Sequence, residues 1–493
     1  MTAGNSPTLD LVALDERARQ ALANGEEEGA LPLLAAAAER ARDSARLWQW
    51  TALLRRALHR HTEALAAFER AAALDPADLS IAYGHAQTMM EAGGDARALF
   101  GRALMLDQGN GDSILGFAAA RLGAGDGVQA ADELEALLAR NPHWVPGHSG
   151  LAQLRGQLGQ RDLVTRSFET ALGVQPDNRQ LWDALIVLLF RAGRFAEAHE
   201  VLLRARRVLG GHAFAAHEVL ILSELGQADA ADARYAAVEA PSDLNYVVHR
   251  VRHLLRTGRA PEAVPLIERC IGEPGASLLW PYIALVWRIT GDPRWEWLEG
   301  DARLVSVTDL TDRLPPLDRL AEVLREMHIT KDQPLDQSLR GGTQTYGILF
   351  TRTEPEIVAL RAAIVEAVAA HIAQLPPPDP AHPILGLRRD RPIRFSGGWS
   401  VRLMGGGHHV NHIHQLGWFS SALYVALPEA QGEQGWLTLG APPAELGLDL
   451  APLRTIAPRP GQLVLFPSTL WHGTLPFDVG ERLTVAFDVA PPR

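Results

Sequence analysis

The sequence is short of cysteine and of long apolar runs. Cys270 is the only cysteine in 493 residues, so no disulfide can form within the chain and nothing indicates an oxidising compartment. The longest apolar run, residues 184–190, is far below the roughly 20 residues that a membrane-spanning helix needs. Residues 1–15 lack the basic start and the apolar stretch of a secretion signal. We therefore expect a cytoplasmic protein that does not enter a membrane.

Aromatic residues and net positive charge are also scarce. Aromatic residues make up 6% of the chain, and the formal net charge is −11. Because a nucleic-acid-binding domain carries a basic face, we predict no nucleic-acid partner. Alanine and leucine are abundant instead, which favours helix in the first part of the chain.

Glycines recur through the first 300 residues at intervals of 30 to 36 positions. They are Gly93, Gly123, Gly159, Gly193, Gly226, Gly258 and Gly291. Prolines recur out of step with them, at Pro76, Pro142 and Pro176, each at the end of an amphipathic segment. Glycine tolerates the positive φ of a tight turn, and proline ends a helix. The pattern therefore predicts repeated helical hairpins.

These hairpins resemble tetratricopeptide repeats (TPRs) over residues 10–300. The resemblance rests on the period and on pieces such as Trp48 followed by Ala67, Phe68 and Pro76. One hairpin cannot bury its apolar face alone, so hairpins stack into an α-solenoid. Such an array offers a concave surface to a peptide or protein; the alternative is a spacer or an oligomerisation element. The scattered histidines of this region show no common metal-ligand spacing.

The pattern changes after Trp297. Two helices are predicted at 317–327 and 354–373, and short alternating runs then predict strands at 399–404, 419–427, 436–439, 462–466 and 482–489. Many short strands separated by glycine and proline are typical of a sandwich, a jelly roll or a barrel. We predict a helical repeat array over 10–300, a linker with packing helices over 301–392, and a β domain over 393–493.

Histidines gather in the β region. His412 and His414 are two positions apart, which in a strand places both side chains on one face. His472 follows another predicted strand. Three neutral imidazoles that converge would leave open positions on a metal, as a catalytic site requires. His408 and His409 lie in a glycine-rich stretch. They either line the mouth of the substrate site or are exposed loop residues, and we favour the second interpretation.

Arg482 follows His472 by ten positions, at the start of the last predicted strand. A guanidinium buried there needs a carboxylate partner, which a dicarboxylate cosubstrate would supply bidentately. Thr484 lies two positions further on, so its hydroxyl faces the same side of the strand.

Residues 330–490 resemble the 2OG-Fe(II) oxygenase family of Fe(II)/2-oxoglutarate dioxygenases, whose members are sometimes fused to TPRs. The resemblance rests on the His-x-His, distant His and Arg signature together with five stretches, namely 337–345, 412–414, 417–421, 435–437 and 465–474. It implies a double-stranded β-helix, with His412, His414 and His472 as iron ligands, and with Arg482 and Thr484 binding 2-oxoglutarate. Tyr424 is a further candidate contact to the cosubstrate.

The chain departs from the wider superfamily at His414, where the common triad has a carboxylate. A third histidine does not neutralise Fe(II). The third ligand is then His414 itself, a carboxylate from elsewhere, or a water.

The resemblance implies a dioxygenase that uses Fe(II), 2-oxoglutarate and O2 to hydroxylate a substrate. With a repeat array attached, we expect a peptide or protein substrate recruited by the TPR surface, although a small molecule fits the same chemistry. Two alternatives stay open. One is a three-histidine, cupin-type iron dioxygenase that does not use 2-oxoglutarate, which would have no need of Arg482. The other is a non-catalytic TPR adaptor, which would bind no metal.

Overall fold

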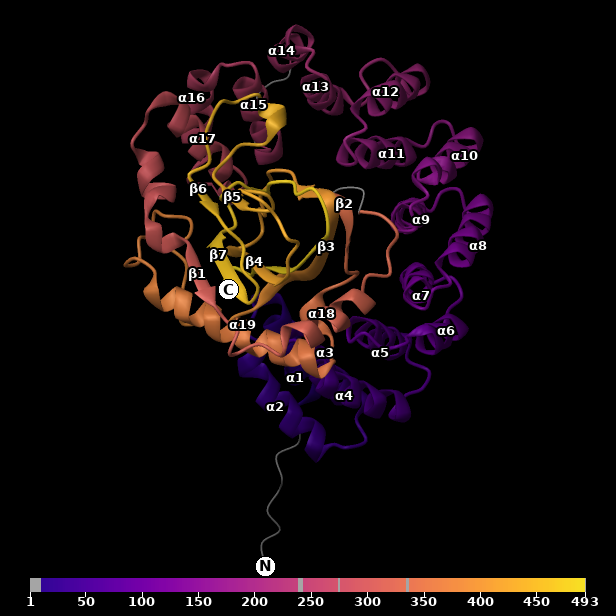
Figure 1. Ribbon diagram of the computed structural model, residues 1–493. Coiled ribbons are helices and arrows are strands. Elements are labelled where there is room, and N and C mark those ends of the chain that lie inside the picture. The colour runs from indigo at the N-terminus through magenta and orange to yellow at the C-terminus, as the bar shows by residue number, and fades with distance from the viewer. Residues whose placement is uncertain (1–9, 238–242, 274, 334–336, 493) are drawn as a thin grey trace, which may run out of the picture. The chain divides into compact units, whose positions relative to one another are not determined.

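The computed structural model describes residues 10–237, 243–273, 275–333 and 337–492 (Figure 1). They form two compact units, one of residues up to Ala130 with Gly347–Arg361, the other of Ala131–Tyr346 with Ala362–Pro492. The division at residues 300 and 392 that the sequence suggests stays a prediction. The first nine residues, part of the stretch that lacks a secretion signal, lie outside the described part.

Helices α1 to α17 precede the first strand among the described residues. Those up to α8 are α1 (Leu11–Asn24), α2 (Glu27–Arg40), α3 (Ala45–Ala57), α4 (His61–Leu74), α5 (Leu79–Glu91), α6 (Arg97–Leu106), α7 (Gly111–Gly123) and α8 (Gly127–Arg140). They are followed by α9 (Val145–Gln157), α10 (Arg166–Val174), α11 (Arg179–Arg191), α12 (Phe195–Leu209), α13 (Ala215–Glu224), α14 (Ala228–Ala237), α15 (Leu244–Arg256), α16 (Ala260–Cys270) and α17 (Trp280–Thr290). Most consecutive helices within each unit pack against one another, as predicted for stacked hairpins.

The hairpin turns use glycines in the left-handed region. Six of the seven predicted glycines have φ between 71° and 85°. Gly123 is the exception, because it ends helix α7, and Gly125 takes the turn with φ 85°. With Gly125 in its place, the turn glycines recur every 32 to 34 residues, counted from their positions. Helices α4, α8 and α10 end two residues before Pro76, Pro142 and Pro176.

Polar side chains start several of these helices. The side-chain oxygens of Asp10, Ser44, Asp78, Asn110 and Asn178 each accept a hydrogen bond from a backbone N–H in the first helical turn. Such a cap satisfies one of the amides that a helix end leaves free. These caps fix where the five helices begin.

The segment from Gly347 to Arg361 belongs to the first unit. Thr351 Oγ1 donates to the carbonyl of Glu91 at 2.8 Å, at the end of α5. The turn at Gly93 passes close to Arg352, and a Cβ at this glycine would lie 2.6 Å from the guanidinium carbon. The repeat glycine therefore also makes room for a segment more than 250 residues further along the chain.

The β domain has two antiparallel sheets. The strands are β1 (Ser306–Asp309), β2 (Leu339–Gln344), β3 (Phe395–His409), β4 (Phe419–Ala426), β5 (Leu437–Leu439), β6 (Arg454–Ile456), β7 (Gln462–Pro467), β8 (His472–Thr474) and β9 (Glu481–Val489). The first sheet has the order β1-β7-β4-β9-β3-β2 and the second β6-β5-β8. The fold class is confirmed: helical hairpins are followed by the paired sheets of a double-stranded β-helix.

The predicted strands are all present, with shifts at their ends. Strand β3 is much longer than the predicted 399–404, because it continues through Gly405–Gly407 to His409, with a register shift opposite β2. Strands β1, β2, β6 and β8 were not predicted. Helices α18 (Leu317–Glu326) and α19 (Pro355–Gln374) match the two predicted helices within one residue at each end.

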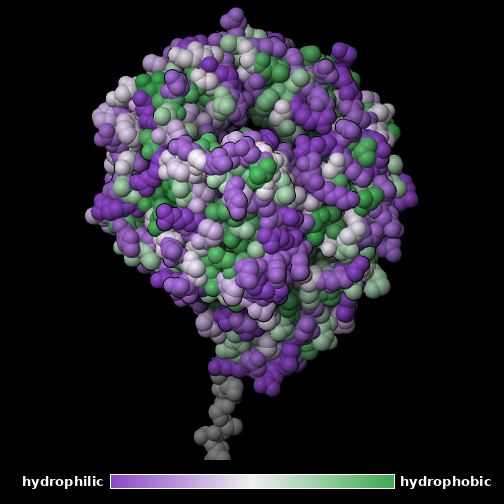
Figure 2. All heavy atoms as spheres, viewed as in Figure 1, coloured by the Kyte–Doolittle hydropathy of each residue, from purple (hydrophilic) through white to green (hydrophobic). Residues whose placement is uncertain are grey.

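Short helical turns connect these elements. They are η1 (Arg161–Leu163), η2 (Ala276–Leu278), η3 (Glu296–Gly300), η4 (Ala302–Leu304), η5 (Leu349–Thr351) and η6 (Ala444–Leu446). Of the helices that the structure describes, none is long and apolar enough to cross a membrane. On the face seen in Figure 2, hydrophilic and hydrophobic residues are interspersed.

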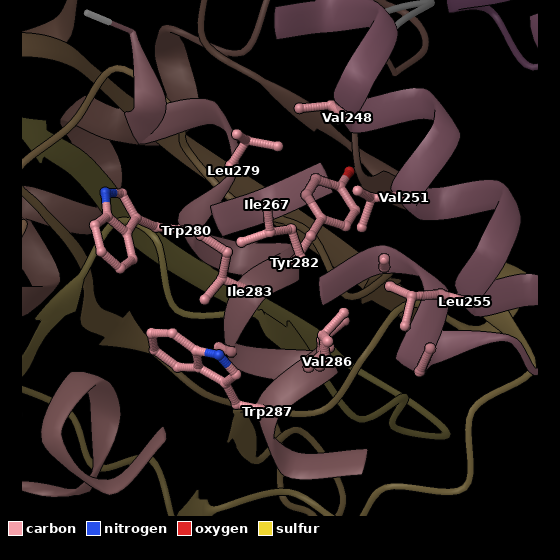
Figure 3. Packing of buried hydrophobic residues seen from close by; sticks show 14 of the residues in the cluster. Val248, Val251, Leu255, Ile267, Leu279, Trp280, Tyr282, Ile283, Val286 and Trp287 are labelled. Atoms are coloured by element: carbon pink, nitrogen blue, oxygen red, sulfur yellow. The ribbon is translucent and has the colours of Figure 1, made fainter. Parts of the chain in front are cut away.

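The last helices of the array share a hydrophobic core with the β domain. Figure 3 shows this cluster, in which residues of α15, α16 and α17 converge, among them Tyr282 and Trp287. Leu446 and Trp471 of the β domain belong to the same cluster. Trp471 Nε1 also donates to the carbonyl of Pro281 at 3.0 Å. Helices α15–α17 are therefore packed onto the β domain as one body.

Polar contacts strengthen the same junction. Arg288 of α17 donates to the carbonyls of Gly440 and Ala451, the second at 2.8 Å. Arg256 of α15 donates to the carbonyl of Glu445 at 3.0 Å. These donors satisfy loop carbonyls that have no strand partner, which holds the loops between β5 and β6 against the helices.

We predict that His371 makes the stability of the second unit fall in acid. This α19 side chain is buried against the ring of Phe419, its Nε2 has no hydrogen-bond partner, and burial lowers its pKa to about 4. Between pH 6.5 and 4 the unfolded chain takes up a proton that the folded chain does not, so folding weakens as the pH falls. In His371→Leu, the fall in the free energy of unfolding between the two pH values should be smaller by roughly 3 kcal/mol. Urea unfolding of both proteins at pH 7.5 and 4.5 measures this free energy.

The matched control is His143→Leu at an exposed position. It should leave the difference between the two pH values as in the wild type. An equal acid loss in His371→Leu and in the wild type would contradict the prediction.

Candidate functional site

Three histidines converge at one end of the small sheet. His412, His414 and His472 each offer a ring nitrogen, and these three atoms lie within 4.8 Å of one another. His472 opens strand β8, while His412 and His414 lie in the irregular segment between β3 and β4. The convergence that the sequence indicated is therefore present.

The reason for the convergence differs from the predicted one. His412 and His414 do not lie on a strand, so the two-residue alternation does not align them. Instead, the amide of His412 donates to the carbonyl of His472 at 2.9 Å, and the amide of His472 donates back at 3.0 Å. The amide of His414 donates to the carbonyl of Ser468 at 3.0 Å. Backbone bonds between two loops hold the imidazoles together.

Each ring has an acceptor at Nδ1. This nitrogen lies 2.9 Å from the carbonyl of Val410 in His412, and 3.0 Å from the carbonyl of Leu470 in His472. In His414 it lies 2.7 Å from Oδ2 of Asp488. Carbonyl and carboxylate oxygens only accept, so Nδ1 carries the proton in all three rings. The lone pair of each Nε2 stays free to bind a metal.

The surroundings of His412 and His472 keep these two imidazoles neutral. Burial, together with the neighbouring rings, lowers the pKa of His412 to about 3 and that of His472 well below its ordinary value. A neutral imidazole is the form that coordinates a metal. The donor set therefore suits a transition-metal ion with open coordination positions.

Arg482 is a buried cation without an anion. Only 2% of its surface is exposed, and burial lowers its pKa. Its guanidinium carbon lies 5.2 Å from the ring centroid of Tyr424. Within the described residues, Arg482 Nε and the Tyr424 hydroxyl have no hydrogen-bond partner, and no carboxylate forms an ion pair with this arginine. A buried charge of this kind is costly unless a ligand pairs with it.

One cavity joins the histidines to the arginine. Its walls include His412, His414, His472, Arg482 and Thr484, five of the predicted site residues. Tyr424 contacts Arg482 but is not among the described residues that line this cavity. Arg482, Thr484 and Asp488 point inward from β9, at the alternate positions expected for a strand.

The sequence interpretation missed two residues of this cavity. His409 was expected in an exposed loop, but it ends strand β3, is half-buried, and lines the cavity beside His412, with ring centroids 5.7 Å apart. Burial lowers its pKa well below the ordinary value. The expectation of exposure is therefore wrong for His409. Asp488 was not singled out, although its even spacing from Arg482 along the last strand could have indicated an inward position.

A second, wider cleft is also lined by two of these histidines. It has a volume of about 750 Å³ and is lined by the segment from Val410 to Gly417, by Trp399 and by Trp471. Arg252 and Tyr282, from helices α15 and α17, also line it. His412 and His414 lie in the walls of both hollows. The two hollows therefore adjoin at these histidines, and we call the small one the inner cavity and the large one the outer cleft.

Comparison with known proteins supports the family resemblance of the β domain. Residues 397–488 match the family model described as "Putative 2OG-Fe(II) oxygenase". This match confirms the resemblance for the part of the chain that contains the histidines and Arg482. No curated protein sequence matches the chain.

Solved structures of two kinds are similar to parts of the chain. A prolyl-4-hydroxylase from Pseudomonas putida is 18% identical, covering 39% of this chain and 95% of its own, with a TM-score of 0.28. The TPR protein YrrB is 19% identical, covering 36% of this chain and 93% of its own, with a TM-score of 0.24. A TPR protein from Parabacteroides merdae is 15% identical, covering 52% of this chain and 90% of its own, with a TM-score of 0.29. These scores are low and carry no inference about function.

We predict that Arg482→Met stabilises the protein. Methionine fills a similar volume without a charge, so the folded state no longer contains an unpaired buried cation. The free energy of unfolding should rise by about 1 to 3 kcal/mol. Chemical denaturation without added metal or 2-oxoglutarate measures the change.

Arg402→Met is the matched control, because Arg402 has an ion pair with Glu481 at 2.5 Å. It should not stabilise the protein. A lower free energy of unfolding in Arg482→Met than in the wild type would show that the arginine has a structural partner.

Proposed function

We propose that the β domain is an Fe(II)- and 2-oxoglutarate-dependent oxygenase that hydroxylates a peptide or protein substrate. The observation that supports this most is the unpaired, buried Arg482 in the same cavity as three converging histidines. A metal site alone does not need a buried cation nearby. A cosubstrate that binds the metal at one end and carries a carboxylate at the other explains both.

The histidines would hold the metal. His412, His414 and His472 would each direct Nε2 at one ion, because Nδ1 is engaged in every ring. Three protein ligands leave positions for the cosubstrate and O2. Iron, O2 and 2-oxoglutarate together would supply the oxidation of a C–H bond, with succinate and CO2 as coproducts.

Arg482 and Thr484 would hold the distal carboxylate of 2-oxoglutarate. A guanidinium binds a carboxylate through two parallel hydrogen bonds, and Thr484 faces the same cavity from the next inward position of β9. The Tyr424 hydroxyl, which has no partner among the described residues, lies beside the guanidinium and would help to orient it. Because the cavity excludes most water, the attraction between the guanidinium and the carboxylate of 2-oxoglutarate would be stronger than in solution.

The outer cleft would bind the substrate. It is lined by two of the same histidines, and its volume of about 750 Å³ leaves room for a substrate side chain and the atoms around it. Its walls combine Trp399, Tyr282 and the exposed side chain of Leu416 with backbone of the segment between β3 and β4. Because Arg252 and Tyr282 come from the array, the repeats would contribute to substrate selection at the metal itself.

The proposal is tested by anaerobic titration of the protein with Fe(II) and then with 2-oxoglutarate. We expect a visible charge-transfer band from the chelate in the wild type, and a strongly weakened band in Arg482→Met. Thr484→Val should weaken cosubstrate binding roughly tenfold, the cost of one hydrogen bond to a charged group. His143→Gln, far from the site in sequence and exposed, is the control.

Other outcomes have distinct meanings. Iron binding without the band would favour the three-histidine dioxygenase that does not use 2-oxoglutarate. The absence of metal binding would contradict both enzymes and favour the TPR adaptor.

A peptide substrate predicts a role for Leu416 at the cleft. Its side chain is 78% exposed in the absence of a ligand, and it lines the cleft. In a screen of a peptide library by mass spectrometry, we expect peptides that gain one oxygen atom. Leu416→Ala should raise KM for such a peptide roughly tenfold, since a buried leucine contributes this much to binding. Val479→Ala, at an exposed position that does not line the cleft, should leave KM unchanged.

Oxygen incorporation into no peptide, together with turnover of a small molecule, would contradict the peptide assignment. An unchanged KM in Leu416→Ala would contradict the outer cleft as the binding site.

A further inference from the structure

The proposed metal ligands are three histidines with no carboxylate among them, and one buried acid, Asp488, contacts the ring of His414. Asp488, on strand β9, is 7% exposed, and its Oδ2 lies 2.7 Å from Nδ1 of His414. Among the described residues it forms no ion pair with a lysine or arginine. The buried carboxylate therefore has one ionic contact, and this contact is a candidate metal ligand.

A hydroxyl network holds the other oxygen of this carboxylate. Ser420 Oγ donates to Oδ1 of Asp488 at 2.6 Å, and the hydroxyls of Ser420 and Ser468 lie 2.9 Å apart. All three side chains are buried. Since a carboxylate only accepts, Oδ1 is satisfied by the serine, and Oδ2 stays directed at His414.

The backbone around this network is shaped to fit it. A Cβ at Gly417 would lie 2.3 Å from Ser468 Oγ and 3.3 Å from Cβ of Asp488. Any side chain at this position would therefore displace the network. On the other side, the ring of His414 stacks on Trp399, with centroids 5.6 Å apart and planes inclined by 14°. The imidazole is held between an indole face and a carboxylate.

We propose that Asp488 supplies the negative charge of the metal site through His414, in place of a carboxylate bound directly to the metal. This inference rests on the metal site of the proposed function. A carboxylate hydrogen-bonded to Nδ1–H increases the basicity of the ring and fixes its tautomer and orientation. Asp488 is thus a positioning residue that also reduces the net positive charge of the metal and its ligands.

The test measures metal binding and redox potential rather than turnover. Wild type, Asp488→Asn and Asp488→Ala are titrated with Co(II) alone, followed by its visible absorption. Asparagine keeps the size of the side chain and an oxygen that accepts from Nδ1, but it has no charge. We expect Asp488→Asn to bind Co(II) about 10- to 100-fold more weakly than the wild type, and Asp488→Ala at least as weakly. Ser420→Ala should show a smaller loss.

The reduction potential separates charge from orientation. An anionic environment favours Fe(III) over Fe(II), so the Fe(III)/Fe(II) midpoint potential of Asp488→Asn should be more positive than that of the wild type. Asp478→Asn, an exposed acid of the same domain, is the control and should change neither property. Thermal unfolding without metal checks that the variants fold; should Asp488→Ala not fold, Asp488→Asn carries the test alone.

An unchanged Co(II) affinity or an unchanged potential in Asp488→Asn would overturn the inference. A wild type that binds no Co(II) would instead overturn the metal site. A wild type that binds metal, with Asp488→Asn weakened, but gives no band with 2-oxoglutarate would overturn the proposed cosubstrate and leave the role of Asp488 standing.

Discussion

The two backbone hydrogen bonds between His412 and His472 are the contact on which the site depends. They join an irregular segment to the first residue of a three-residue strand. The ring centroids of the two histidines are 4.2 Å apart. The inner cavity and the outer cleft both take their position from this pair.

The segment that carries His472 is also held by the helices of the array. Trp471 lies in the core of helices α15–α17 and donates to the carbonyl of Pro281, so the residue before a candidate ligand is packed into the helical array. Through this tryptophan, the packing of the last repeats and the geometry of the histidine cluster are linked. The TPR-like array is therefore part of the structure of the site, whichever partner its other surfaces bind.

The sequence predicted the chemistry of the site better than its geometry. The spacing of glycine and proline indicated the hairpins, because glycine permits the tight turn and proline ends the helix. The histidines and Arg482 stood out because they are uncommon residue types at a specific spacing. The short strands β6 and β8 have too few residues for alternation to be visible. The roles of Asp488 and of His409 depend on which strands pair, and the wall formed by Tyr282 depends on tertiary packing. No local pattern contains that information.

Helices α15–α17 share a hydrophobic core with Leu446 and Trp471. This core limits where the chain can be cut into separate domains. A cut at the change of pattern near residue 300 would look natural in the sequence, yet it would leave a tryptophan and a leucine of the β domain facing water. The shortened domain would carry an apolar patch beside its candidate ligand His472 and would tend to self-associate. For the same reason, exchange of this array for another by recombination would require matching changes in the loop before His472, so the two parts are expected to be inherited together.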